Sequence, residues 1–293
     1  MIRSALKITA VFAACLIFLS GTLSESPDAM SWPSADANLM RNFGSNDNGR
    51  PVLGMIFGGG TDVFAAEKGE IIFSRGKNDS VSRLPSPFGA WTAVDHGDGL
   101  ISIYSRYNDN NTTLTQIEKS QPIAYSGNSG WSSNDGFYFI IYDRRDRRWI
   151  NPAMIVTPLP GTPPLQIFSV TFADSQGTAV QPGNLAQGRY AVLVNAVLPA
   201  VPAAQRNLFA PYRIICLVNG AEAGLLNFEA FYARDGVLMI SRNGLVSAKQ
   251  VYSAFPAFEA AEIFLTRGQA NMEIIVQDIA GNSRNYASRL TVN

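Results

Sequence analysis

Short runs of β-branched and aromatic residues alternate along most of the chain with clusters of glycine, asparagine, aspartate and proline. Beyond the N-terminal apolar run, no long stretch repeats its apolar residues every ~3.6 positions, as an amphipathic helix does. Short apolar runs between turn clusters are typical of strands. The pattern predicts an all-β protein, with strands at residues 70–73, 91–94, 100–104, 137–142, 190–194, 213–218, 237–240 and 272–276.

The clearest boundary in the chain is the segment from Thr157 to Pro164, which contains four prolines. Proline has no backbone N–H to donate within a sheet. The segment therefore predicts a linker at residues 158–164 between two domains, residues 31–157 and residues 165–293. A length of 293 residues accommodates two domains of ordinary size.

The N-terminus has the pattern of a targeting segment. Arg3 and Lys7 lead into an apolar run from Ile8 to Leu19, whereas a membrane-spanning helix needs roughly 20 apolar residues. This predicts a signal peptide within residues 1–29 and an exported protein, periplasmic or associated with the cell envelope, with no stable membrane span after cleavage. An uncleaved signal anchor is the alternative. Lipid attachment at Cys15 is disfavoured because the apolar run continues beyond it.

The charge balance and the cysteine content exclude some classes of function and of bonding. The 23 basic residues balance 23 acidic ones. Proteins that bind nucleic acid carry clustered basic residues, so no nucleic-acid partner is expected. Cleavage of the signal peptide would leave Cys216 as the one cysteine, so no internal disulfide is expected. Its place within the apolar run 212–218 predicts a small buried side chain in a strand.

Five segments of the first domain resemble, in the same order, motifs of the LytM or lysostaphin-type zinc metallopeptidases, which cut peptide cross-links in bacterial cell walls. The second of them includes a hairpin turn, Asp95–Gly99, whose tip carries His96. The resemblance implies an antiparallel β domain of the LytM type, a duplicated hybrid motif. The five segments are Gly60–Ile72, Ala93–Tyr104, Ile117–Gly130, Asp135–Ile141 and Ile150–Pro152.

The residues that the family uses for chemistry are replaced. The family binds zinc through a His and an Asp of an H-x-x-x-D motif and the second His of H-x-H, leaving one position for water. Residues 48–59 contain no histidine, Arg106 stands where the family has the His of Y-x-H-L, and Gly136 and Tyr138 replace H-x-H. His96 matches a turn histidine that is not a ligand. The resemblance therefore implies a pseudoenzyme with no catalytic residue, metal or cofactor.

If the motifs align, Tyr104, Arg106, Trp131 and Tyr138 line the groove that holds substrate in active relatives. Aromatic rings and an arginine can stack on sugar or peptide planes and pair with carboxylates of the wall peptide. The alternative is that the groove has filled with ordinary packing. The charged run Asp143–Trp149 has two interpretations as well, a solvated turn or a docking patch for an anionic wall polymer or an acidic partner.

The second domain resembles bacterial immunoglobulin-like domains. Gly188–Ala196 follows their G-x-Y-x-V-x-V-x-A strand, and Asp278–Asn282 resembles their D-x-x-G-N turn. The resemblance implies a C-terminal immunoglobulin-like β-sandwich that acts as a spacer or a docking surface. The domain is longer than the usual ~100 residues, so we expect an insertion at residues 199–211 or 220–235.

These observations predict a non-catalytic cell-envelope protein, a pseudopeptidase. It would bind peptidoglycan or regulate a cell-wall hydrolase through its former substrate groove. The alternative is a structural or assembly component of an envelope complex without affinity for peptidoglycan. An unrelated hydrolase has no support in the sequence, because activation of a serine or cysteine needs a positioned base and His96 is the one histidine.

Overall fold

The computed structural model describes residues 29–35, 38–47, 49–76, 86–108, 114–132, 134–156, 164–199 and 208–293. The predicted signal peptide up to residue 28, with Cys15, and linker residues 158–163 lie outside this part of the chain. The described residues are almost entirely β, as predicted, with one short helix, α1 (Ala248–Val251), and a 3-10 turn, η1 (Pro152–Met154). No helix among them has the length and apolar character to cross a membrane.

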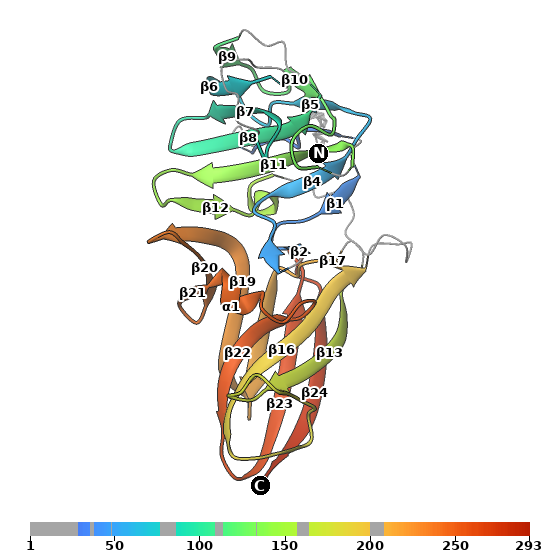
Figure 1. The fold of residues 1–293 in the computed structure, drawn as a ribbon, viewed down its shortest axis with the longest axis vertical. Coiled ribbons are helices and arrows are strands. Elements are labelled where there is room, and N and C mark those ends of the chain that lie inside the picture. The colour runs from blue at the N-terminus through green and yellow to red at the C-terminus, as the bar shows by residue number, and fades with distance from the viewer. Residues whose placement is uncertain are drawn as a thin grey trace, which may run out of the picture.

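The N-terminal unit, residues 29–156 where described, is built on one antiparallel sheet (Figure 1). Strand β11 (Gly136–Asp143) lies at its centre, with β8 (Leu100–Tyr107) along one side and β4 (Met55–Gly58) and β12 (Arg148–Ile150) along the other. Beyond β8 the sheet continues through β7 (Ala90–Asp95), β6 (Gly69–Arg75) and β9 (Gln116–Ile117). The remaining strands are β1 (Leu39–Arg41), β2 (Asn46–Asp47), β3 (Arg50–Pro51), β5 (Asp62–Phe64) and β10 (Pro122–Tyr125).

Strand β11 is buried on both faces, which explains its nearly continuous apolar sequence. Side chains alternate across a strand, so Phe137, Phe139 and Ile141 point into the main core of the unit. Tyr138 and Ile140 point to the opposite face, where they pack in a second apolar cluster with Val52, Ile56, Ile103 and Trp149.

The C-terminal unit, residues 164–293 where described, consists of two sheets that pack on a shared core. Cys216 lies in this core, fully buried in a strand as predicted, and burial raises the pKa of its thiol to about 12. The D-x-x-G-N segment forms the expected turn, in which Asp278 Oδ1 accepts from the Asn282 backbone N–H. An immunoglobulin-like topology stays a prediction. One sheet contains β13 (Gln166–Ala173), β14 (Ala179–Val180), β16 (Gly188–Pro199), β17 (Leu208–Phe209) and β22 (Phe258–Leu265). The other contains β15 (Asn184–Leu185), β18 (Arg213–Val218), β19 (Ala221–Arg234), β20 (Val237–Arg242), β21 (Leu245–Ser247), β23 (Gly268–Gln277) and β24 (Ser283–Val292).

One of the two segments expected as an insertion is a regular strand. Residues 221–234, within the segment 220–235, form the 14-residue strand β19. Its first half pairs with β18, and its second half pairs with both β20 and β12. The extra length therefore serves the junction between the two units. Residues 200–207 of the other predicted insertion lie outside the described residues.

The two units are joined by backbone pairing as well as by side chains. Strand β12 pairs with β19 through Trp149↔Phe231 and its neighbours, so one sheet runs through both units, which lie end to end (Figure 1). Phe43 of the N-terminal unit lies in the core of the C-terminal unit, with its ring centroid 5.2 Å from that of Phe231. Asn42 Nδ2 donates to the Ala210 carbonyl and Asn42 Oδ1 accepts from the Ala210 N–H, both at 2.8 Å.

Candidate functional site

The strand register places Tyr138 in apolar surroundings. Strand β11 pairs Tyr138 with Ile56 of β4 on one side and with Ser105 of β8 on the other. Residues directly opposite in a sheet point to the same face. The Tyr138 ring is buried there, and its hydroxyl oxygen accepts a 2.8 Å hydrogen bond from the Leu53 backbone N–H. Burial raises the pKa of Tyr138, and the hydrogen bond from Leu53 opposes this effect. The phenol is therefore a fixed structural group.

The chain beside Tyr138 leaves no room for another side chain. At Gly54, a Cβ atom would lie 2.2 Å from the Phe139 carbonyl oxygen, 2.8 Å from Ile140 Cγ1 and 2.9 Å from Tyr138 Cε2. Contacts this short do not occur between non-bonded atoms. No metal ligand can therefore project from position 54 toward β11.

The side chains on this face do not fit the zinc ion that the LytM-type resemblance implies. Protein zinc sites use histidine nitrogen, cysteine sulfur or carboxylate oxygen, whereas this face presents Tyr138, Ile56, Ile103 and Ser105. Among the described residues, no group of three or more His, Cys, Asp or Glu side chains is placed to hold a metal ion. Arg106 adds a positive charge that would repel a divalent cation.

Arg106 owes its orientation to a bulge in β8. Ala90 pairs with Tyr107 and Trp91 with Ser105, so Arg106 is an extra residue with no partner on β7. Its φ of 72° lies in the left-handed region, which costs a residue other than glycine on the order of 1 kcal/mol. Bulges redirect side chains. The guanidinium carbon of Arg106 lies 5.0 Å from the ring centroid of Tyr138, within cation–π range. Partial burial lowers the pKa of Arg106, and Tyr138 opposes this.

Arg106 and Trp131 line a common cleft of about 160 Å³, which we call the Arg106 cleft. Trp131 stands at its rim with 74% of its surface exposed, and its backbone N–H donates to the Pro87 carbonyl. The loop before Trp131 is fixed by Ser129, whose Oγ accepts from the Ala90 N–H. Arg106 Nε is buried and has no hydrogen-bond partner among the described residues. The other lining residues are Met40, Arg41, Asp47, Ile56, Ser132, Asn134, Asp135 and Gly136.

The structure thus brings together three of the four predicted groove residues. Arg106 and Trp131 line the cleft, and Tyr138 lies beneath the Arg106 guanidinium. The prediction for Tyr104 is wrong, because Tyr104 is fully buried in the main core and its hydroxyl oxygen accepts from the Ala66 N–H. Burial raises the pKa of Tyr104 to about 12. Whether the other three bind a ligand stays a prediction.

Three charged residues of the cleft were not predicted from the sequence motifs. Arg41 and Asp47 come from β1 and β2, before the first recognised motif, and nothing in their sequence marks them. Asp135 opens the motif segment that leads into β11, but it stands at no ligand position. Only the folded arrangement places these charges beside Arg106.

His96 lies at the hairpin turn, as predicted, but its side chain is bonded to neighbouring residues. The turn itself forms as predicted, but the imidazole folds back, with Nδ1 2.8 Å from the Lys68 carbonyl oxygen and Nε2 2.7 Å from Ser102 Oγ. This serine–histidine pair was not foreseen. It cannot supply a nucleophile, because Ser102 is fully buried and also lies 3.0 Å from the Tyr104 hydroxyl. The pair is a structural link between turn and sheet.

The half-buried position of His96 makes stability depend on pH. Burial lowers the pKa of His96 below its ordinary value of 6.5, against smaller opposing effects of the Lys68 carbonyl, Glu67 and Asp95. The unfolded chain therefore binds the proton more readily than the folded one. The contribution of His96 to stability is complete above the unfolded-state pKa and is lost as the pH falls below it. We expect the free energy of unfolding in urea to fall between about pH 7.5 and about pH 5.5, and to fall less in a His96→Gln variant. An equal fall in both proteins would contradict this role.

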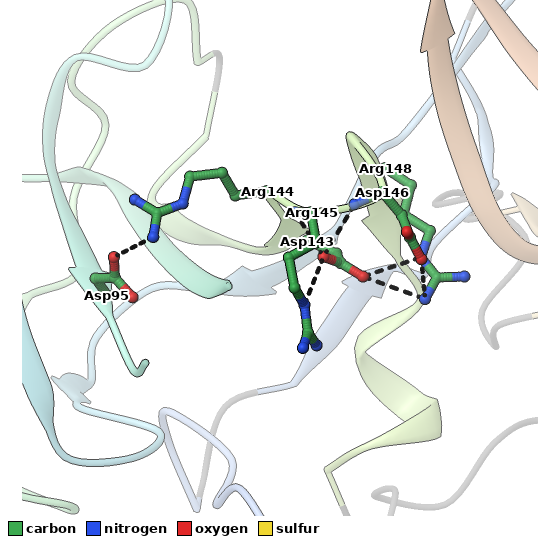
Figure 2. Close-up of polar contacts among 6 residues, drawn as sticks. All are labelled: Asp95, Asp143, Arg144, Arg145, Asp146 and Arg148. Atoms are coloured by element: carbon green, nitrogen blue, oxygen red, sulfur yellow. Dashed lines mark hydrogen bonds and ion pairs between the residues drawn. The ribbon is translucent and has the colours of Figure 1, made fainter. Parts of the chain in front are cut away.

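The charged run from Asp143 to Trp149 has the properties of a self-paired turn. Figure 2 shows Arg144 reaching across to Asp95, at 3.3 Å, and Arg148 contacting both Asp143 and Asp146. The buried Asp143 carboxylate also accepts from the Arg145 backbone N–H. These contacts occupy most of the basic groups within the hairpin and its neighbour. They favour the solvated turn over a docking patch for an anionic polymer.

Comparison with known protein families gives a match for the N-terminal unit. Residues 54–152 match the model of peptidase family M23, and residues 164–293 match a second model that carries no description. No curated protein matches the sequence.

Several solved structures are similar at low identity. The SpoIIQ–SpoIIIAH pore forming complex is 18% identical, with 44% of this chain and 91% of that chain covered and a TM-score of 0.36. The catalytic domain of the M23 protein EnpA of Enterococcus faecalis is 15% identical, with 42% of this chain and 94% of that chain covered and a TM-score of 0.35. The antimicrobial peptidase lysostaphin of Staphylococcus simulans is 16% identical, with 73% of this chain and 85% of that chain covered and a TM-score of 0.36.

Proposed function

Because residues 54–152 form a domain of the peptidase family M23 type whose ligand positions do not fit zinc, we propose that this protein is a non-catalytic cell-envelope protein. It binds peptidoglycan, or regulates a cell-wall hydrolase, through the Arg106 cleft. Of these two roles we argue the first. The targeting pattern of residues 1–29 supports export to the envelope.

The state of Arg106 carries this proposal. A groove that had merely filled with packing would be expected to satisfy its polar atoms and relax its backbone. Arg106 instead keeps a left-handed φ of 72°, and its Nε has no partner in the part of the chain that the structure describes. Its guanidinium is held over Tyr138, and the exposed indole of Trp131 stands at the same cleft. Strain and unpaired donors of this kind concentrate at binding sites.

Co-sedimentation with purified peptidoglycan sacculi tests the proposal. We expect the wild-type protein to sediment with sacculi, and Arg106→Ala and Trp131→Ala each to weaken binding about tenfold, since arginine and tryptophan dominate binding energies. Phe264→Ala is the matched control, because this aromatic side chain is 57% exposed on the other unit. Equal loss in all three variants would contradict a role for the cleft. Stoichiometric zinc in the purified protein would contradict the non-catalytic part of the proposal.

The second candidate is a structural or assembly component of an envelope complex without peptidoglycan affinity. The sheet that continues from β12 into β19 supports it, because it makes the two units a single stiff body suited to spacing other components. Absence of wild-type protein from the sacculus pellet, together with no effect on the activity of a cell-wall amidase, would favour this role over the first.

A further inference from the structure

The Arg106 cleft contains two positive and two negative side chains. Arg41 and Asp47 face each other with 3.7 Å between Nη2 and Oδ1, a loose pair. The other two charged residues of the cleft are Arg106 and Asp135. Neither makes an ion pair with any residue in the described part of the chain, including the other. Two opposite charges therefore share one cleft without neutralising each other.

We propose that this cleft binds a small zwitterion, an amino acid or a short peptide with both termini free, with the carboxylate on Arg106 and the ammonium group on Asp135. The inference rests on the proposed function and specifies the charges that its ligand carries. Trp131 at the rim supplies an apolar surface for the carbon atoms next to the charges.

The Arg106 guanidinium is held in a position suited to binding a carboxylate. Its two terminal nitrogens form a fork from which a carboxylate can accept bidentately, whereas Nε is buried. The ring of Tyr138 holds the guanidinium in place. The bulged backbone is fixed by the Arg106 N–H, which donates to the Phe88 carbonyl at 2.9 Å. Little freedom is therefore lost when a ligand binds.

Asp135 is held at the same cleft by its backbone neighbours. The next residue, Gly136, exchanges two backbone hydrogen bonds with Gly127, at 2.7 and 2.9 Å. Gly59 packs so closely that a Cβ there would lie 2.6 Å from Asp135 Cβ. The exposed carboxylate of Asp135 thus projects from a fixed position.

The charge set of the cleft argues against a ligand of one sign. A simple carboxylate would meet Asp47 and Asp135 as well as the arginines, and a simple amine would meet Arg41 and Arg106. Like charges at short range oppose binding. A ligand that carries both signs gains from Arg106 and Asp135 together.

Three forms of one dipeptide test the inference. Alanyl-alanine carries both charges, its N-acetyl form only the carboxylate, and its C-terminal amide only the ammonium group. The chemical shift of the Trp131 indole N–H is followed by NMR during titration of the full-length protein up to tens of millimolar, because so small a ligand binds weakly. We expect alanyl-alanine to bind about tenfold more tightly than either blocked form, since a charged hydrogen bond accounts for about that factor.

Variants assign each charge to its side chain. Arg106→Ala should abolish the preference over the C-terminal amide, and Asp135→Asn the preference over the N-acetyl form. Arg145→Ala and Asp146→Asn, at the charged hairpin, should change neither. Equal binding of all three forms, or no response to alanyl-alanine, would overturn the inference. If the protein sediments with sacculi while the dipeptide fails, only this inference falls; failure of both removes the proposed function too.

Discussion

Replacing Phe43 with alanine should lower the free energy of unfolding by about 3–5 kcal/mol, the range found for buried phenylalanines. Phe43 belongs to the N-terminal unit by sequence, yet it is 1% exposed within the core of the C-terminal unit and packs on Phe231. Loss of the ring leaves a cavity between paired strands that cannot close without breaking their hydrogen bonds. Urea denaturation followed by circular dichroism and by tryptophan fluorescence measures the effect.

The control for Phe43→Ala is Phe168→Ala, because Phe168 is 56% exposed. Substitutions at exposed positions usually change stability by less than about 0.5 kcal/mol. A loss below about 1 kcal/mol in Phe43→Ala would show that the junction is loosely packed. A wild-type protein whose two units unfold at separate urea concentrations would contradict their coupling.

The junction bears directly on the Arg106 cleft. Arg41 and Asp47 line the cleft, and the residues between them are anchored to the C-terminal unit. Asn42 is bonded to Ala210, and the Tyr252 hydroxyl donates to the Gly44 carbonyl at 2.5 Å. One wall of the cleft is therefore held in place by the C-terminal unit. We expect a change in the packing of this unit to shift the segment between Arg41 and Asp47.

Local sequence signals predicted the strands well because they depend on neighbouring residues. Alternating or continuous apolar runs and glycine-rich turns marked β6, β7, β8, β11, β16, β18, β20 and β23. They also placed Cys216 in a buried strand. The LytM-type motifs added the fold type of the first domain, because their order along the chain is characteristic of that family.

The error at Tyr104 shows the limit of local signals. Tyr104 and Arg106 are two positions apart, so a regular strand would place both side chains on one face. The bulge at Arg106 breaks this alternation and separates them. An arginine in the left-handed region has no sequence signature, whereas a glycine there would have suggested a bulge. The faces of β8 could therefore not be assigned from the sequence.

Contacts between residues far apart in the chain could not be predicted from the sequence either. Nothing in the sequence indicated that Phe43 would pack on Phe231 of the other unit. The extra length of the C-terminal unit suggested an insertion, but not that residues 221–234 would form a strand that pairs with β12. Arg41, Asp47 and Asp135 join the cleft for the same reason, through the fold alone.

Replacing Gly54 with alanine should destabilise the protein by about 3 kcal/mol or more, at the upper end of the cost of overpacking. The added methyl group would overlap the Phe139 carbonyl oxygen, a backbone atom, and would press on Ile140 and Tyr138. Strand β4 would have to move away from β11, which would disturb both the Tyr138 ring and the guanidinium above it. Urea denaturation gives the loss of stability, and the Trp131 indole signal in NMR reports the change at the cleft.

Gly58→Ala in the same strand is the matched control, because the nearest atom to a Cβ there, the Asn38 carbonyl oxygen, is 3.6 Å away, an ordinary contact. We expect it to change stability by less than about 1 kcal/mol. Equal stability of the two variants would mean that β4 can shift and that the floor of the cleft is not fixed. If Gly54→Ala behaves as expected, a histidine at position 138 alone could not recreate a metal site. Position 54 has no space for a side chain, so the packing of this segment against β11 excludes a metal ligand there.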